Sequence, residues 1–177
     1  MENNCFYDMR ITGKRDNVYE LIKMLQWKDE YKESGLGRTF SCDIVSDACV
    51  ITNDILFIDV AGDCAWSVLC AMREEYKPAP LWSLEKASRE LDLIIEVFSS
   101  ECGCCFQEHV LIYKGDIHID DCVDYEEHWV SGYNSLEEYN KENETNFTED
   151  MINENGDICI GGFENYGEFQ WFGDEYL

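Results

Sequence analysis

The pattern of apolar and polar positions divides the chain into short strands and helices. Residues 5–13 begin with apolar side chains, alternate between the two kinds from Tyr7 to Thr12 and stop at a glycine, which predicts a strand ending in a turn. Residues 18–31 carry apolar side chains at helical spacing behind the candidate cap Asp16-Asn17, which predicts a helix. The same two patterns continue to residue 125. They predict strands over 40–52, 55–61, 93–98, 105–113 and 117–125, and helices within 63–76 and over 81–91.

These elements follow one another as β-α-β-β-α-β, and further antiparallel strands come after them. This is the order of the ferredoxin-like split βαβ arrangement, in which helices cover one face of a sheet. The sequence therefore predicts an α+β fold with a ferredoxin-like βαββαβ core over residues 1–115. No internal repeat is evident.

Residues 116–177 follow a different pattern, and we predict that they form an acidic, aromatic-containing extension packed on the core. We expect a marginal acidic helix over 133–144, a short turn or helix over 147–152 and a strand over 157–161. Residues 162–172 then alternate aromatic with acidic side chains. Because so dense an aromatic run does not stay exposed to water, we expect it to fold back onto the sheet or to contact a partner.

The negative charge is concentrated in the same extension. The whole chain has 38 acidic and 13 basic residues, a net charge of −25. Residues 1–115 hold 20 acids and 12 bases, a net of −8, whereas residues 116–177 hold 18 acids and Lys141, a net of −17. Such a field repels nucleic acid and anionic membranes and attracts basic surfaces. A solubilising tail or adaptation to high salt is one explanation, but confinement to one segment that is not low-complexity favours a binding surface.

The composition also bears on the compartment. No apolar run reaches 18 residues, and the first residues lack the basic and apolar regions of a signal peptide. We therefore expect a cytoplasmic protein that does not enter a membrane. Its ten cysteines are then expected to be reduced, several of them packed as small apolar side chains.

Residues 102–109 contain the candidate metal ligands Cys102, Cys105 and His109. The Cys102-Gly103-Cys104 spacing is tighter than the cysteine pairs of structural zinc sites, so we expect neither a metal nor another cofactor. A Cys/His metal-binding protein stays as an alternative. The chain has no phosphate-binding glycine loop, no HExxH and no GxSxG motif. We therefore expect no enzymatic activity and no catalytic residue.

Several short motifs resemble the YubB-type ferredoxin-like domains of plasmids, phages and integrative elements. Asn4-Cys5 with residues 10–13 resembles the opening of these domains, and Ala65-Trp66-Ser67 resembles their Trp-Ser motif, although the prolines that follow it there are missing. The resemblance continues through residues 83–93, 96–103 and 106–109 and covers about residues 3–117. It implies a protein of a mobile element, where small acidic accessory proteins often disarm host defences.

Direct, strong nucleic-acid binding is not expected. Ferredoxin-like sheets can stack RNA bases on aromatic side chains, but this mode also needs basic residues against the phosphates. The bases here are few and are surrounded by a net charge of −25. They lie mainly in the first strand and helix and comprise Arg10, Lys14, Arg15, Lys23, Lys28 and Lys32.

The extension instead predicts a mimic of nucleic acid. Duplex DNA carries one negative charge per ~1.7 Å of axis, and a folded surface with dense carboxylates can occupy a groove made for it. On a strand, Asp120, Asp124 and Glu126 share one face, and Asp121 and Glu127 project from the other. Buried aromatics are expected to hold this surface in shape, namely Trp129, Tyr133, Trp171 and Phe172. The predicted partner-binding residues are Asp116, Asp120, Asp121, Asp124, Glu126, Glu127, Glu137, Glu138, Glu142 and Glu144.

The expected partner of this surface is a basic host protein. A CRISPR effector nuclease comes first and a restriction enzyme second, which would make the chain an anti-CRISPR-like inhibitor. The main alternative is a non-catalytic interaction module of a mobile element whose acidity only keeps it soluble.

Overall fold

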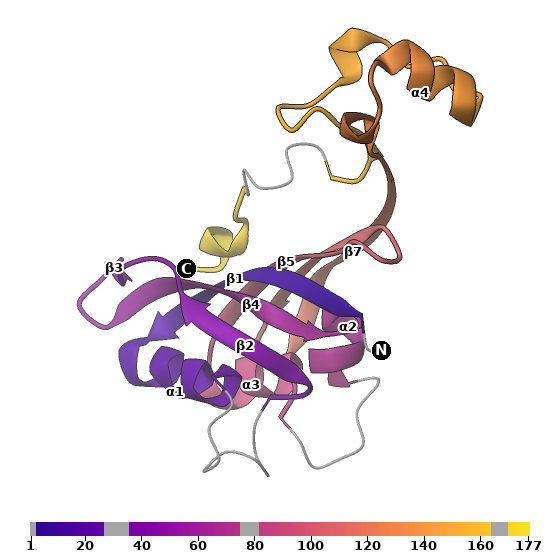
Figure 1. Cartoon of the computed structure of the whole chain (residues 1–177). Coiled ribbons are helices and arrows are strands. Elements are labelled where there is room, and N and C mark those ends of the chain that lie inside the picture. The colour runs from indigo at the N-terminus through magenta and orange to yellow at the C-terminus, as the bar shows by residue number, and fades with distance from the viewer. Residues whose placement is uncertain (1–2, 27–35, 75–81, 164–169) are drawn as a thin grey trace.

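The computed structural model describes residues 3–26, 36–74, 82–163 and 170–177. It is an α+β protein built on an eight-stranded antiparallel sheet of order β2-β4-β1-β5-β6-β7-β8, with β3 paired to β4 beside this order (Figure 1). The strands are β1 Asn4–Lys14, β2 Thr39–Ile44, β3 Cys49–Val50, β4 Ile55–Ala65, β5 Ile94–Glu101, β6 Phe106–Tyr113, β7 Asp116–His128 and β8 Ile158–Gly161. The helices are α1 Arg15–Leu25, α2 Val68–Met72, α3 Leu84–Leu91 and α4 Leu136–Asn143, with 3-10 turns at Val130–Gly132, Glu149–Met151 and Gly173–Tyr176. Within the described ranges, no helix has the length and apolar character needed to span a membrane.

The predicted α+β class is confirmed, and most elements lie where the pattern places them. The strand predicted over 40–52 is divided into β2 and β3. The helix predicted within 63–76 is short because β4 continues to Ala65 and Trp66 adopts a left-handed conformation, with φ of 70°. Ser67 then caps α2 by accepting a hydrogen bond from the Cys70 N–H. The expected end of the first helix near Tyr31 and the expected start of the later one at Leu81 lie outside the described residues.

Helices α1, α2 and α3 cover one face of the sheet, and the main apolar core lies between them and the strands (Figure 1). Odd-numbered residues of β1 from Cys5 to Ile11 point into this core and are fully buried. From α1, Leu21 and Leu25 meet them because residues four apart share one face of a helix. The strand order places β1 between β4 and β5. Helix α1 connects β1 to β2, and α2 with α3 connect β4 to β5.

The C-terminal residues 170–177 lie against the opposite face of the sheet (Figure 1). The rings of Phe98 and His109 stack there with centroids 3.9 Å apart, and Trp171 meets Phe98 edge-on at 5.4 Å. The buried carboxylate of Glu96 accepts hydrogen bonds from the main-chain N–H groups of Phe172 and Gly173, each at 2.8 Å. The described aromatic residues at the C-terminus therefore fold back onto the sheet, which is one of the two alternatives predicted for residues 162–172. Residues 164–169 lie outside the described part.

Beyond Tyr125, β7 leaves the main sheet and enters a small lobe, defined here as residues 126–161. In this stretch its partner is β8, and Figure 1 shows the lobe standing away from the sheet at the end of β7. The lobe has its own apolar cluster, formed by Val130, Leu136, Tyr139 and Ile158 with Tyr133, Phe147 and Ile152 against it. Strand β7 therefore belongs to both bodies, and residues 116–124 of the predicted extension are part of the main sheet.

Candidate partner-binding surface

Acidic side chains line a free edge of the sheet along β7. Strand β6 pairs with residues 116–124 on one side, whereas β8 pairs only from Tyr125 onward on the other. Among the described residues, 116–123 therefore have no strand partner on their outer side, whereas the Asp124 carbonyl accepts a hydrogen bond from the Gly162 N–H. The exposed acids along this edge are Asp116, Asp120, Asp121 and Asp124. Charged side chains on an edge also prevent unspecific strand pairing.

The strand alternation divides these acids between the two faces of the sheet. Asp120 lies opposite Val110, which belongs to the core beneath the helices. Asp121 lies opposite His109, on the face that the C-terminal segment covers. The predicted separation of Asp120 from Asp121 is thus observed. The acids of the two faces come together only along the β7 edge of the sheet. A groove of a partner protein would therefore have to enclose this edge to contact both sets of acids.

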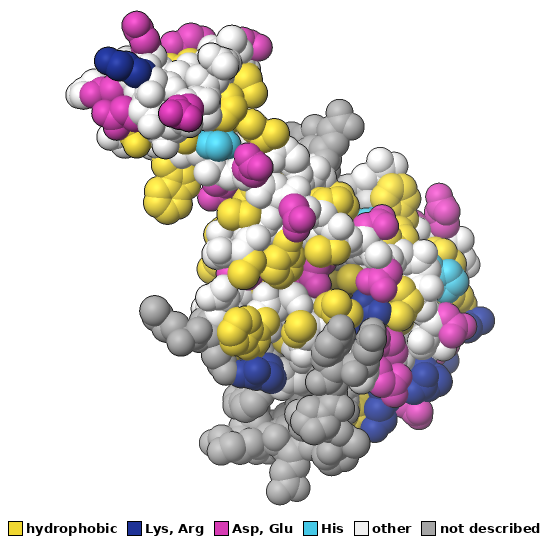
Figure 2. Space-filling view, turned by 90° about the vertical axis from the view of Figure 1, so that its right-hand side faces the viewer, with side chains coloured by type: hydrophobic (Ala, Val, Ile, Leu, Met, Phe, Trp, Pro, Cys, Tyr) yellow, Lys and Arg dark blue, Asp and Glu magenta, His cyan; other side chains and the backbone are white. Residues whose placement is uncertain are grey.

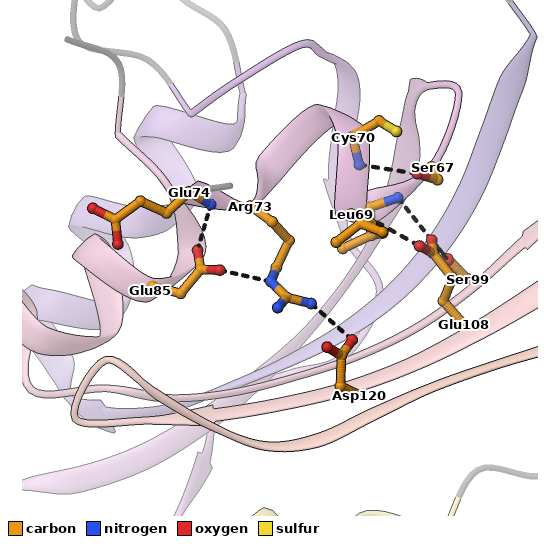
Figure 3. A network of polar contacts seen from close by, with 10 residues as sticks. Ser67, Leu69, Cys70, Arg73, Glu74, Glu85, Ser99, Glu108 and Asp120 are labelled. Atoms are coloured by element: carbon orange, nitrogen blue, oxygen red, sulfur yellow. Dashed lines mark hydrogen bonds and ion pairs between the residues drawn. The ribbon is translucent and has the colours of Figure 1, made fainter. Parts of the chain in front are cut away.

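A buried arginine ties Asp120 to the interior (Figure 3). Nη1 of Arg73 donates to Oδ1 of Asp120 at 3.0 Å, and Nε donates to Oε1 of Glu85 at 2.6 Å. The side chain of Arg73 is 2% exposed, whereas that of Asp120 is 57% exposed. Burial alone would lower the pKa of the Arg73 guanidinium, but the hydrogen bonds to Asp120 and Glu85 outweigh it and raise the pKa. Asp120 is therefore a fixed and partly neutralised member of the acidic edge.

A second buried carboxylate, Glu108 on β6, holds the start of α2 (Figure 3). It accepts hydrogen bonds from the N–H groups of Val68 and Leu69, at 2.8 and 3.2 Å, and from Oγ of Ser99 at 2.6 Å. The carboxylate thus satisfies two otherwise unpaired N–H groups at the start of this helix, and the Ser99 hydroxyl completes its hydrogen bonding. Because Arg73 directly follows α2, Glu108 also helps to place the guanidinium beneath β7.

The lobe carries ten acids and one base, Lys141, a net of −9. Glu137, Glu142 and Glu144 are exposed, and Figure 2 shows acidic side chains spread over the outer surface of the lobe. Glu138 is half-buried, since its Oε2 accepts hydrogen bonds from the main-chain and side-chain N–H groups of Asn134. The lobe acids are therefore displayed by a folded body.

Asp157 instead helps to close the lobe. Its Oδ1 accepts hydrogen bonds from the N–H of Ser131 at 3.0 Å and from its Oγ at 2.7 Å. These bonds favour the ionised form and hold the pKa of Asp157 below its usual value. The contact joins the 3-10 turn at the start of the lobe to the residue before β8.

The exposure of Trp129 contradicts the prediction that it is a buried support. Its side chain is 70% exposed at the start of the lobe, with Nε1 3.4 Å from Oε2 of Glu127. Tyr133, Trp171 and Phe172 are partly buried, as a supporting role requires. Trp129 lies just outside the lobe cluster, because the chain turns away there into the 3-10 turn Val130–Gly132. It gives the acidic surface an aromatic side chain.

The candidate metal ligands Cys102, Cys105 and His109 lie in two different places in the fold. Cys102 and Cys105 lie in the turn between β5 and β6, where Sγ of Cys105 donates to the carbonyl oxygen of Cys102. His109 is buried within β6, with Nε2 2.8 Å from Oε1 of Glu96. In the part of the chain that the structure describes, no three His, Cys, Asp or Glu side chains are grouped as metal ligands would be.

The linear charge of β7 can be compared with that of DNA. At ~3.3 Å per residue, the six acids from Asp116 to Glu127 span about 36 Å, roughly one charge per 6 Å. One strand of DNA has a charge every ~3.4 Å of axis and the duplex one every ~1.7 Å. Strand β7 alone therefore carries about half the linear charge of a single DNA strand. The acids of the lobe are needed to bring the charge density of the surface closer to that of a nucleic acid.

In comparisons with known proteins, no family model, no curated protein and no solved structure matches this chain.

The residues that shape the candidate surface are identified from their contacts in the structure. Sequence reasoning missed three of them, Arg73, Glu85 and Glu108. No signal marks Glu108, because its neighbours Gln107 and His109 are polar too and this part of the strand resembles an exposed one. Arg73 carries no signal either, since an arginine at the end of a helix is ordinarily exposed.

Proposed function

We propose that this protein is a stoichiometric inhibitor that occupies the basic nucleic-acid-binding groove of another protein with the acids of β7 and the lobe. The observation that carries this proposal is the display of the charge on a strand edge and a folded lobe. A disordered acidic tail would lose conformational entropy on binding. The cluster of Val130, Leu136, Tyr139 and Ile158 keeps the lobe folded, so this loss is smaller here.

The fold and the resemblance support a narrower form of the proposal. The order β2-β4-β1-β5, with α1 and the α2–α3 pair crossing one face, agrees with a ferredoxin-like core. The motifs similar to YubB-type domains lie within this core. We therefore propose a non-enzymatic, cytoplasmic anti-defence protein of a mobile element. Its target is a CRISPR effector nuclease in the first instance and a restriction enzyme in the second.

The experiment compares two triple variants with the same net charge. The first reverses acids of β7, as Asp121→Lys, Asp124→Lys and Glu127→Lys. The control reverses three exposed acids outside β7 and the lobe, as Asp54→Lys, Glu90→Lys and Glu175→Lys. Binding of target duplex by a guide-loaded Cas9-type nuclease is measured with each protein at low and moderate salt.

The wild type and the control should block target binding, more strongly at low salt, because counterion release and steering both weaken with salt. The β7 variant should lose inhibition by roughly 100-fold, since each reversed contact removes about 1 kcal/mol or more. Equal losses in both variants would show that net charge alone matters and would refute the assigned surface. No block of target binding by the wild type would refute the nuclease as target.

The exposure of Trp129 favours a second candidate function, a non-catalytic interaction module of a mobile element. Exposed aromatic side chains are enriched where proteins meet, and they often dominate the binding energy. In that case partner capture would depend on Trp129 and change little with salt. Replacement by alanine, tested in a pull-down from the native host at two salt concentrations, separates this module from a charge-driven inhibitor.

A further inference from the structure

The two free edges of the sheet are lined differently. The edge of β7 carries acids, whereas the edge formed by β2 and β3, residues 39–50, exposes apolar side chains. Both strands pair with β4 on their inner side and have no strand partner on their outer side among the described residues. The large apolar side chains exposed along this edge and its turn are Phe40, Ile44, Val45, Val50 and Ile51.

Strand β2 has one exposed charge, Asp43, and one irregularity, but lacks the other features by which proteins prevent strand pairing. Edge strands usually carry lysine, proline, an inward-pointing charge or a bulge. Residues 39–72 contain no lysine, arginine, histidine or proline. The pairing with β4 shifts register between Thr39 and Ser41, but Ser41–Ile44 are paired regularly. Their outer main-chain groups are therefore arranged to receive another strand.

The charge around this edge indicates the chemistry of its partner. Residues 38–72 hold five acids and one base, Arg38, a net of −4. Arg10 neutralises one of them, since Nε and Nη2 bind both oxygens of Asp59 at 2.7 and 2.8 Å. Asp43 and Asp47 are exposed on the edge itself. A second copy of the chain would bring the same negative charge and be repelled, whereas a segment with basic side chains is complementary.

We propose that β2 is the docking site for an extended segment of a partner protein in which apolar and basic residues alternate. The segment adds a strand beside β2, where the outward-facing main-chain groups of Cys42 and Ile44 provide the pairing. Ile44 contacts its apolar side chains on one face, and Asp43 meets its basic ones on the other. This site is independent of the proposed inhibitory surface, because β2 and β7 lie on opposite sides of the central strands in the sheet order.

Synthetic heptapeptides serve as probes in the test. One alternates lysine and valine, a second has the same sequence with N-methylated valines, and a third alternates glutamate and valine. Binding is followed by amide chemical shifts and hydrogen exchange of the full chain. The lysine–valine peptide should bind with protection of the Cys42 and Ile44 amides, which face the outer side of β2. The N-methylated peptide, of equal charge, should bind roughly 10-fold more weakly because it lacks donors for pairing.

Two variants locate the site. Ile44→Lys with Val45→Lys should abolish binding of the lysine–valine peptide, whereas Asp121→Lys with Asp124→Lys should retain binding at β2. Circular dichroism checks that both are folded. Equal binding of the N-methylated peptide, or shifts confined to β7 and the lobe, would refute strand addition. A dimer of the unliganded chain that the Ile44 and Val45 changes dissociate would also overturn the proposal, in favour of a second copy.

Discussion

Oδ1 of Asp120 lies 3.0 Å from Nη1 of Arg73, so an exposed acid of the proposed binding edge is bonded to a buried cation. The other partner of that cation, Glu85, is buried with it. Exposed ion pairs contribute about 0–1 kcal/mol, whereas removing one partner of a buried pair costs about 3–5 kcal/mol. The two acids around Arg73 should therefore differ greatly in their effect on stability.

We predict that Glu85→Ala lowers the free energy of unfolding by about 3–5 kcal/mol, because the Arg73 guanidinium loses its buried counter-charge. Asp120→Asn should lower it by less than about 1 kcal/mol, since solvent already screens this pair. Urea unfolding of the two variants beside the wild type measures both values. Equal effects would mean that Asp120 contributes to the network as much as Glu85 does.

Glu96 should be essential for attachment of the C-terminal segment. We predict that Glu96→Ala lowers the free energy of unfolding by about 2 kcal/mol or more, because it leaves the Phe172 and Gly173 N–H groups without their acceptor. Amide exchange at these two residues should accelerate. Glu175→Ala, an exposed change in the same segment, is the control and should leave exchange unchanged. Unchanged exchange in Glu96→Ala would refute the anchoring role.

Asp8 should destabilise the folded protein at neutral pH. Burial, and secondarily the charge of Asp59, raise the pKa of this carboxyl. An acid with a raised folded-state pKa opposes folding above that pKa, and the cost disappears as the pH falls below the ordinary value of about 3.9. Asp8→Asn should therefore stabilise by about 0.5 kcal/mol at pH 7 and by nothing near pH 3. Urea unfolding at both pH values tests this, and destabilisation at pH 7 would contradict it.

Asp157 should have the opposite pH dependence. Its hydrogen bonds from Ser131 lower its pKa, so its contribution is complete above the unfolded-state pKa and is lost as the pH falls through the lower folded-state value. We predict faster amide exchange at Ser131 in Asp157→Asn at pH 7, and a smaller difference from the wild type near pH 3 after correction for intrinsic exchange. Glu154→Gln is the control; an equal effect there would refute the assignment to the Asp157 contact.

The main body was largely predictable because its strands and helices bury one side each. The period of two over residues 7–12 and the helical period after Val18 both report burial against a shared core. The lobe was less predictable. Leu136 and Tyr139 indicate a helix, but their spacing does not say how far that helix stands from the sheet. Trp129 was placed wrongly because hydrophobicity alone does not decide which aromatic side chain is covered.

The buried polar contacts of the candidate site were beyond sequence reasoning. Glu85, Glu96 and Glu108 look like ordinary members of an acidic composition, yet each accepts hydrogen bonds from main-chain N–H groups elsewhere in the fold. Such contacts depend on tertiary placement. The exposed acids of β7 were easier to locate, because strand alternation alone separates Asp120 from Asp121.

Since one uninterrupted strand belongs to both bodies, the direction in which the lobe points depends on whether β7 has an odd or even number of residues. One residue inserted between Tyr125 and Glu126, matched by one before Gly161 in the paired β8, would exchange the two sides of both strands and turn the lobe over relative to the sheet. Two residues inserted in each strand would restore the direction and move the lobe outward by about 6.6 Å. Relatives of this chain should therefore tolerate insertions here in pairs, whereas an ordinary linker would accept any length.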